Sequence, residues 1–390
     1  MAPAAHARLS PSASVRFLNC PASLLLEEQF PDRSTPDADA GTLAHKIAEL
    51  KLRFYFGKPA PMTKTEYNAE LKQLKQNPIY AAKMSNDTDM YLDAVKELAL
   101  SFPSQPGLVA IEEQFSAAEW ATDCWGTADC VLMGSGRLCV VDYKNGVAPV
   151  SPEYNSQMMI YALAAFSSQR LTYGDSIEQI SLTIVQPNAG GVKTWELTTG
   201  ELLKWGNEVL RPGAELALSG KGPAKADPNG WCKFCRAQHV CKALTRMRLS
   251  LESDAHTEPK LLTDAELGDV LRRGAGLISW YGRLKDYALS AALSGRKIAG
   301  FKVAEGKTSR KWKDVDVAFK TLKERGVDEA LLWNREPVTV PQLEKILGKK
   351  DFTTNAKGLW QKTPGKPALV EEDNPRPPYN AAKVVFTEVK

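Results

Sequence analysis

The sequence predicts an α/β fold, in which helices cover the faces of a central sheet. Short runs of apolar or alternating residues, bounded by turn residues, indicate strands. Longer segments in which apolar residues recur every three or four positions are typical of helices that pack on a core. We expect strands at 109–115, 130–133, 138–141, 177–186 and 192–197. The expected helices lie before, between and after these strands, at 21–29, 42–56, 87–100, 152–167 and 200–218.

The second and third expected strands are predicted to form a hairpin, with one carboxylate just before it and one just after it in the sequence. The apolar segments 130–133 and 138–141 are joined by the short turn Gly134-Ser-Gly136. Asp129 precedes the first strand, and Asp142 follows the second. These two positions lie side by side in an antiparallel pair, so the hairpin brings two carboxylates together at one end of the sheet.

This pair of carboxylates is a candidate metal site. Two neighbouring negative charges repel each other unless a cation lies between them, and oxygen ligands suit Mg²⁺ or Mn²⁺. Lys144 lies two residues beyond Asp142, so strand alternation places it on the same face. An ammonium group there can orient an attacking water and stabilise charge on a phosphate. The alternative is a surface hairpin whose polar ends are solvated.

His45 is a third candidate, on the helix 42–56 that Thr42 can cap. His45 and Glu49 are one turn apart and share a neighbouring face of this helix. They form either a His–Glu surface pair or, for His45, a metal ligand or phosphate contact. The residues of this helix expected to face the core are Leu43, Ile47 and Leu50.

Two further polar groups lie beside the hairpin in the sequence. Gln157 and Tyr161 share one face of the expected helix 152–167. They form either a buried hydrogen-bonded pair or a contact with DNA or with the catalytic strand. Glu113, in the expected strand 109–115, either approaches the metal or is an exposed edge carboxylate.

Together these features resemble the PD-(D/E)XK nuclease superfamily and, within it, the RecB-like exonucleases. In that family a helix carries a His, and a strand begins with an Asp. The next strand ends in Asp/Glu-x-Lys, and a later helix carries Gln-x-x-x-Tyr. The resemblance covers roughly residues 10 to 245. The matching residues occur in the same order: His45, Asp129, Asp142 with Lys144, and Gln157 with Tyr161.

The resemblance implies a restriction-endonuclease-like fold with a central mixed sheet and a Mg²⁺- or Mn²⁺-dependent deoxyribonuclease activity. It implies that Lys144 positions the attacking water and that the products carry 5′-phosphate and 3′-hydroxyl ends. The implied metal ligands are His45, Asp129, Asp142 and the backbone carbonyl of Tyr143.

The chain has seven cysteines, and three of them are close together. Arg8, Arg16, Glu27 and Glu28 interrupt the N-terminal segment, so we expect no signal peptide and a cytoplasmic location. Disulfides are rare in that reducing compartment, which points to metal ligands or buried thiols. The compact set is Cys232, Cys235 and Cys241, whereas the expected core cysteines are Cys124, Cys130 and Cys139.

One early cysteine followed by a late three-cysteine group resembles the iron–sulfur nucleases of the AddB type and of CRISPR adaptation. The resemblance implies a [4Fe–4S] cluster that joins the N-terminal helix to the end of the nuclease domain. Its ligands would be Cys20, Cys232, Cys235 and Cys241. The alternative is zinc, held by the late cysteines with either Cys20 or His239 as the fourth ligand.

The remaining third of the chain is expected to be mainly helical, with one long helix running from Thr263 to about Leu293. A net charge of +4 is small, so affinity for nucleic acid must come from local patches. One such patch interleaves basic and aromatic residues, which suits phosphate contacts and base stacking, or is simply a solvated basic surface. It comprises Arg310, Lys311, Trp312 and Lys313. The expected division is a disordered 1–12, a nuclease domain 13–248, a linker 249–262, a helical domain 263–364 and a tail 365–390.

The predicted function is that of a metal-dependent DNA exonuclease. The whole chain also resembles phage-encoded proteins found near replication genes, which implies a role in phage replication or recombination. The expected partners are DNA and phage single-strand-binding or recombination proteins, with oligomerisation left open. We expect no membrane segment, since no apolar run approaches the roughly 20 residues that span a bilayer. The alternatives are a non-catalytic DNA-binding scaffold and a zinc-stabilised interaction module.

Overall fold

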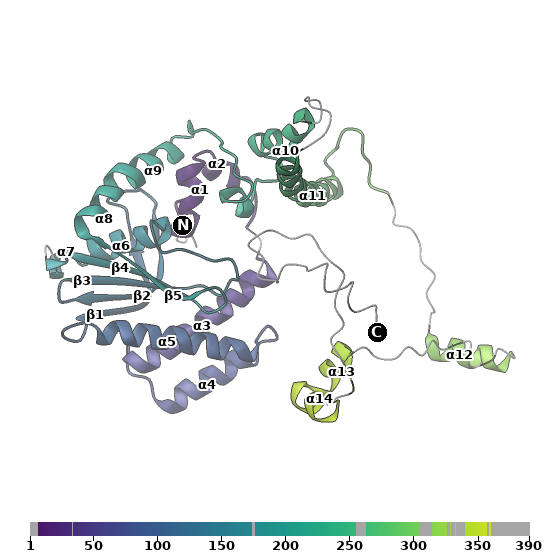
Figure 1. Cartoon of the computed structure of the whole chain (residues 1–390), viewed down its shortest axis with the longest axis horizontal. Helices are drawn as coiled ribbons and strands as arrows, with labels where there is room; N and C mark the ends of the chain where they lie inside the picture. The colour runs from purple at the N-terminus through teal and green to yellow at the C-terminus, as the bar shows by residue number, and fades with distance from the viewer. Residues whose placement is uncertain are drawn as a thin grey trace, which may run out of the picture. The chain divides into compact units, whose positions relative to one another are not determined.

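A computed structural model describes most of the chain (Figure 1), which separates into two compact units, Met1–Val303 and Ala304–Lys390. The first unit contains the sheet and the cysteine-rich segment. The described residues are 7–32, 34–173, 176–254, 263–304, 314–325, 328, 332, 340–356 and 359.

A five-stranded mixed sheet forms the centre of the first unit. Its strands follow one another in space in the order of the sequence, and each neighbouring pair is antiparallel except β3 and β4, which are parallel. This arrangement confirms the predicted α/β fold with a mixed central sheet. The strands are β1 (Leu108–Ser116), β2 (Trp125–Gly134), β3 (Arg137–Tyr143), β4 (Gln179–Gln186) and β5 (Gly191–Thr198).

Helices cover both faces of this sheet (Figure 1), and α2, α3, α5, α6 and the run from α8 to α9 overlap the predicted helices. In the first unit they are α1 (Ser14–Asn19), α2 (Ser23–Glu27), α3 (Pro36–Phe56), α4 (Lys64–Lys75), α5 (Ala82–Leu100), α6 (Ser156–Ser168), α7 (Arg170–Tyr173), α8 (Thr199–Trp205), α9 (Arg211–Leu218), α10 (Lys242–Asp254) and α11 (Asp264–Leu293). A π-helical segment, Gly206–Leu210, joins α8 to α9, so the expected helix 200–218 is one continuous helical run.

Strand alternation divides the core into two layers. In β2, Val131 and Met133 pack into the core cluster that contains α6, whereas Cys130 and Leu132 pack into the cluster that contains α3 and α5. Successive strand residues point to opposite faces, so an all-apolar strand is expected where both faces are covered. Figure 1 shows α3 and α5 on one side of the sheet and α6 on the other.

The β2–β3 hairpin forms as predicted. Cys130 pairs with Val141, and Gly134 pairs with Arg137 at the turn. Ser135 and Gly136 have φ values of 47° and 80°, which match the left-handed pair of a two-residue hairpin turn. The register that follows places Asp129 and Asp142 at the same end of the hairpin.

Helix α3 begins earlier than predicted. Its cap is Thr35, whose hydroxyl accepts from the Ala38 backbone N–H at 3.2 Å, rather than Thr42. Thr42 instead lies within the helix and donates to the Ala38 carbonyl. The polar segment before Thr42 is part of the helix and has Pro36 at the first helical position, where proline fits.

Helix α4 was not predicted, because its segment is rich in polar residues. None of its residues is fully buried, although Leu71 and Leu74 pack against the core cluster that contains Leu43 and Ile47. It begins with a capping box in which the Thr63 hydroxyl accepts from the Glu66 N–H and the Glu66 carboxylate accepts from the Thr63 N–H.

The expected disorder of residues 1–12 is wrong for the part that the structure describes, which begins at residue 7. Leu9 is fully buried in the core that contains α6, and its backbone N–H donates to the Asp123 carbonyl at 3.1 Å. Composition alone cannot anticipate that a short Ala-, Pro- and Ser-rich segment supplies a core residue.

The C-terminal part is helical where it is described. Helix α11 begins at the predicted cap Thr263, which forms a capping box with Glu266. In the second unit the helices are α12 (Val315–Glu324), α13 (Val340–Leu347) and α14 (Lys349–Asn355). The boundaries of the predicted linker, helical domain and tail stay predictions.

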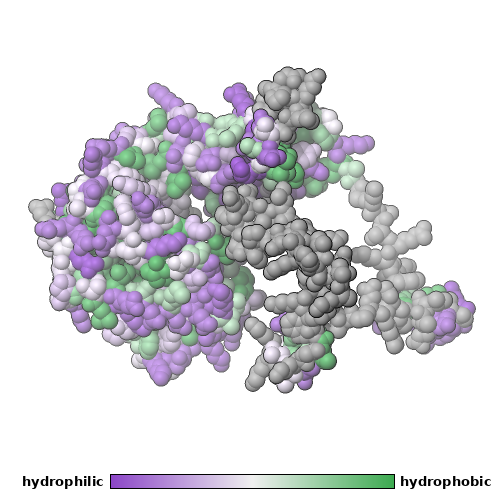
Figure 2. Space-filling model, viewed as in Figure 1, coloured by the Kyte–Doolittle hydropathy of each residue, from purple (hydrophilic) through white to green (hydrophobic). Residues whose placement is uncertain are grey.

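The visible surface of the sheet-containing part carries hydrophilic and hydrophobic residues interspersed (Figure 2). Within the described ranges, no helix is both long enough and apolar enough to cross a membrane.

Candidate metal centre

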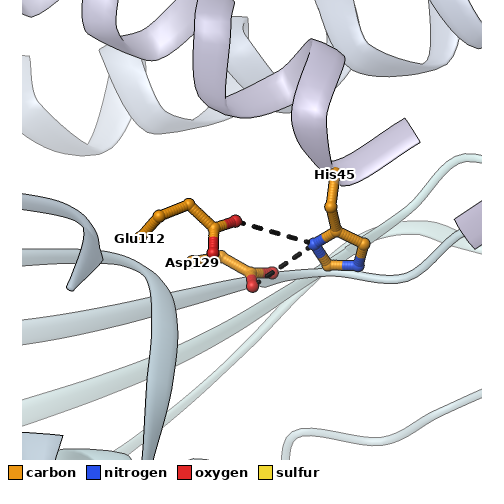
Figure 3. Close-up of side chains that lie close together, drawn as sticks. All are labelled: His45, Glu112 and Asp129. Carbon is orange, nitrogen blue, oxygen red and sulfur yellow. Dashed lines mark ion pairs between the residues drawn. The ribbon is translucent and has the colours of Figure 1, made fainter. Parts of the chain in front are cut away.

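Three metal-ligating side chains converge at one end of the sheet (Figure 3). His45 projects from α3, Glu112 from β1 and Asp129 from β2. One potential ligand atom from each lies within 4.8 Å of the others. His45 Nδ1 is 3.3 Å from Asp129 Oδ1 and 4.0 Å from Glu112 Oε1. Two of these residues were predicted, and the third was not.

Glu112 reaches the site because β1 is distorted there. The neighbouring pairs Ile111–Cys130 and Glu113–Ala128 place Glu112 opposite Asp129. Glu112 has a φ of 48°, which is unusual for a residue other than glycine and is typical of functional sites where the surrounding structure imposes strain. Glu113, weighed as an edge carboxylate, is exposed. Strand alternation alone could not reveal that the neighbouring glutamate lies in the site.

The electrostatics of this group favour an added cation. Burial lowers the pKa of His45, but the carboxylate of Asp129 outweighs this effect, so the pKa is raised to about 9. Burial and then the negative charge of Asp129 raise the pKa of Glu112 to about 8, although His45 acts in the opposite direction. Protons therefore offset the carboxylate repulsion here, and a divalent cation can do the same.

The second part of the site is a buried ion pair at the end of β3. Asp142 is only 3% exposed, and its Oδ2 lies 2.9 Å from Lys144 Nζ. Gln157, on α6, joins both: its Oε1 accepts from Lys144 Nζ at 3.1 Å, and its Nε2 donates to Asp142 Oδ1 at 3.4 Å. The helix and the strand thus hold the ammonium group in one place.

One carboxylate oxygen of Asp142 pairs with Lys144. The buried Oδ2 lies in an ion pair with Lys144 Nζ and has no further hydrogen-bond partner among the described residues. Burial raises the pKa of Asp142, and Lys144 opposes this rise. Burial likewise lowers the pKa of Lys144, but Asp142 raises it above its usual value. A buried carboxylate near Asp129 fits a divalent cation.

Tyr143 connects the two parts of the site. Its backbone N–H donates to Asp129 Oδ2 at 2.7 Å. Its ring packs edge-on against His45, with 5.3 Å between the ring centroids. These contacts hold Asp129 and His45 in position, whereas the predicted use of the Tyr143 carbonyl as a ligand stays a prediction.

Tyr161 lies beneath this site rather than in it. Its side chain is 7% exposed, and burial raises the pKa of its hydroxyl while a hydrogen bond with Gln157 lowers it. A Cβ on Gly126 would lie 3.3 Å from the Tyr161 ring, so this strand residue must be small. Gln157 contacts Lys144 and Asp142 at the end of β3, whereas Tyr161 is buried next to Gln157. The roles of this pair stay predictions.

A groove of about 900 Å³ lies between α3 and α4, and none of the candidate ligands His45, Glu112 and Asp129 lines it. Residues of α3, α4 and the segment after α4 line it, including Lys46, Glu49 and Arg53. Glu49 pairs with Arg53 at 3.5 Å and raises the pKa of Glu112, behind burial and Asp129. The predicted basic patch, Arg310, Lys311, Trp312 and Lys313, lies outside the described residues.

The four cysteines predicted to bind a cluster come together around one small internal pocket. Cys20 follows α1, and Cys232, Cys235 and Cys241 precede α10. Two of the sulfur atoms accept backbone hydrogen bonds: Cys20 Sγ from the Lys225 N–H and Cys232 Sγ from the Asp227 N–H, both at 3.3 Å. Such N–H donors stabilise negative charge on sulfur.

Three of these four cysteines are buried, and Cys241 is partly exposed. Burial raises the pKa of Cys20 and Cys232, and raises that of Cys235 to about 12, so a bound cation is needed to keep these groups ionised. The predicted core cysteines Cys124, Cys130 and Cys139 are buried, as expected.

Residues 6–377 match the family described as "Protein of unknown function (DUF2800)". The chain belongs to this family. Among solved structures, the chain is similar to SSO0001, at 15% identity and a TM-score of 0.24 over 50% of this chain and 85% of that one. It is also similar to an alkaline exonuclease (LHK-Exo) from Laribacter hongkongensis. For LHK-Exo in complex with dAMP the identity is 12% and the TM-score 0.23, over 46% of this chain and 93% of that one. For a second LHK-Exo structure the identity is also 12% and the TM-score 0.23, over 46% of this chain and 88% of that one.

Proposed function

We propose that this member of the DUF2800 family is a divalent-metal-dependent deoxyribonuclease. The observation that carries the proposal is one arrangement at the end of the β2–β3 hairpin. A histidine and two carboxylates converge there, and beside them a partly buried lysine pairs with a third, buried carboxylate, Asp142. Phosphodiester hydrolysis needs a cation to neutralise the phosphate and a positioned group beside the attacking water, and this arrangement supplies places for both.

The metal ligands in this proposal are His45, Asp129 and Asp142, with the backbone carbonyl of Tyr143 and, in addition, Glu112. This set consists mainly of carboxylate oxygens, which favour Mg²⁺ or Mn²⁺ over softer metals. When bound, the metal supplies Lewis-acid stabilisation of the phosphate and lowers the pKa of a water molecule.

The protein residues orient the reacting groups. Gln157 fixes Lys144 Nζ through its Oε1, and the carboxylate of Asp142 keeps the ammonium protonated despite its burial. From this position Lys144 can donate a hydrogen bond to the attacking water or to a phosphate oxygen.

The finer assignments rest on the sequence resemblance. They are attack at a DNA end, products with 5′-phosphate and 3′-hydroxyl groups, and a role in phage replication or recombination. A [4Fe–4S] cluster held by Cys20, Cys232, Cys235 and Cys241 belongs with them. Its support is that the four cysteines line one small pocket, although they are far apart in the sequence.

The test is cleavage of end-labelled linear DNA and of a closed circle with Mg²⁺ or Mn²⁺, using protein purified without oxygen. We expect loss of the linear DNA only, and a drop of about 100-fold or more for Lys144→Ala. Lys204→Ala, which removes an exposed lysine on α8, is the matched control and should leave the rate unchanged.

Other outcomes would change the proposal in defined ways. Cleavage of the circle would make the enzyme an endonuclease that uses the same residues. DNA binding without cleavage in either metal would indicate the non-catalytic scaffold. Zinc without iron or sulfide in the purified protein, together with no cleavage, would favour the interaction module.

A further inference from the structure

A second groove, far from the hairpin in sequence, lies between the cysteine-rich segment, α10 and α11. It has a volume of about 350 Å³ and is lined mainly by charged residues. The two helices and the cysteine-rich segment are held together by a small core that contains Cys232, Leu244 and Trp280. Trp280 Nε1 also donates to the Gln238 carbonyl at 3.3 Å. The groove is therefore part of a packed region.

Arg248, on α10, is the unusual residue in this groove. It is only 8% exposed, and its Nε is buried without a hydrogen-bond partner. No described carboxylate forms an ion pair with it. Burying a guanidinium without compensation is costly, because it loses its hydration and gains no partner. A side chain in this state is expected where an anion binds.

The guanidinium of Arg248 packs against the backbone of α11 at a glycine. A Cβ on Gly276 of α11 would lie 2.0 Å from Arg248 Nη1 and 2.8 Å from its Cζ. The guanidinium therefore lies directly against the α11 backbone, and any side chain at Gly276 would displace it. The close approach of a buried charged group explains a glycine in the middle of a long helix, where glycine is otherwise unfavourable.

The acidic groups of the groove already have partners. Asp269 pairs with Arg273 at 3.1 Å and with Arg272 at 3.7 Å. Asp227 Oδ1 accepts the backbone N–H groups of Asn229 and Gly230. The charge of Arg248 thus remains uncompensated. Burial and then the nearby positive charge of Arg283 lower the pKa of Arg248.

We propose that the groove between α10 and α11 binds a phosphate group through Arg248, and that this phosphate belongs to the backbone of a DNA strand. A guanidinium presents a planar fork of N–H donors that matches phosphate oxygens. Arg272 and Arg273 add positive charge at the rim. The assignment of the strand as DNA rests on the proposed function, whereas the phosphate site rests on the groove alone.

The experiment compares Arg248→Gln with wild type in binding a short fluorescent DNA strand, measured by anisotropy in EDTA over a range of salt. Losing one phosphate contact should weaken binding about tenfold at low salt and reduce the slope of log K against log[salt] by about 0.7 to 0.9. Arg246→Gln is the matched control, since Arg246 is exposed on the same helix and carries the same charge. It should change the affinity by less than about twofold.

A second variant protects against a folding artefact. Gly276→Ala fills the space of the Arg248 guanidinium while favouring the helical conformation, so it should weaken DNA binding without destabilising α11. A further experiment adds inorganic phosphate alone and measures its competition with DNA binding and the rise in Tm that it causes. Phosphate should protect wild type and Arg246→Gln, but not Arg248→Gln.

The outcomes separate this inference from the nuclease. If Arg248→Gln binds both DNA and phosphate as tightly as wild type, the proposed phosphate site in the groove is wrong, even if the enzyme cleaves DNA. A loss of phosphate binding alone would overturn the DNA assignment and leave a site for free phosphate. Unchanged binding with an altered spectrum of the cysteine site would assign Arg248 to that site instead. Binding by wild type without any cleavage would overturn the nuclease and retain the groove.

Discussion

Glu112 is the residue whose position depends most on the tertiary structure. Its carboxylate completes the group with His45 and Asp129, although its backbone must adopt a left-handed conformation to do so. Such a conformation costs roughly 1–3 kcal/mol and persists only where surrounding contacts impose it. At this position the fold loses some stability, and the Glu112 carboxylate is placed beside His45 and Asp129.

Glu112→Gln should separate the metal role from the fold. The amide has the same shape, so stability should stay within about 1 kcal/mol of wild type. The lost negative charge should raise the Mg²⁺ concentration required for half-maximal cleavage by about tenfold or more. Metal titration of the cleavage rate measures this shift, with Glu113→Gln as the exposed neighbouring control. Equal metal requirements for the two variants would exclude Glu112 as a ligand.

At this scale the sequence was sufficient wherever a residue's place follows from strand alternation. Asp129, Asp142 and Lys144 could be placed because the hairpin register follows from two apolar strands and a short turn. Glu112 could not, because its left-handed φ has no signal in a single sequence. The pairing of Gln157 with Lys144 required knowing how α6 packs on β3.

At the scale of elements, the loop that follows β3 is held by one buried side chain from β4. Gln186 is 1% exposed and uses both ends of its amide. Its Nε2 donates to the carbonyls of Gly146 and Ala148 at 2.8 and 2.7 Å, and its Oε1 accepts from the Val150 N–H at 3.0 Å. The loop begins directly after Lys144, so Gln186 fixes the chain on the far side of the proposed catalytic lysine.

Gln186→Leu should therefore affect both stability and rate. Three loop groups lose their partner, and each unsatisfied buried group costs about 1–3 kcal/mol, less where water reaches it. We expect a lower Tm and a kcat reduced by about tenfold, with a smaller change in KM, because the lysine is displaced rather than removed. Thr183→Val, on the same strand, removes a hydrogen bond to Thr194 away from this loop and serves as control. A Leu variant with wild-type kcat would show that the loop does not position Lys144.

Helices were predicted where a long periodic segment follows a clear start signal, and they were missed or shortened where the segment is polar. Helix α11 could be placed from its cap and its acidic first turn, whereas α4 is short, rich in polar residues and has no fully buried residue. The start of α3 was predicted at Thr42, but the helix begins at Pro36 in the polar segment before it.

At the scale of the first unit, the cysteine site joins segments that are distant in the sequence. Lys225 donates to the sulfur of Cys20 from 205 positions away. The same junction contains Glu27, which is 5% exposed, lies 3.1 Å from Arg16 Nε and accepts the Arg236 backbone N–H at 2.9 Å. A bound cluster would thus close the chain around the sheet, and the resemblance made this link predictable where composition could not.

Cys20→Ser tests this closure. If the four cysteines hold an iron–sulfur cluster, the variant should lose its visible absorbance and most of its iron, and the N-terminal segment should become sensitive to protease. The expected physical reason is that a ligand which closes a loop of this length stabilises the fold chiefly by restricting the unfolded chain. Cys124→Ala is the control, because Cys124 is a buried core residue, and it should keep the cluster while losing some stability. Retention of absorbance and iron in Cys20→Ser would remove the N-terminal helix from the site, and the late cysteines would then need a different fourth ligand.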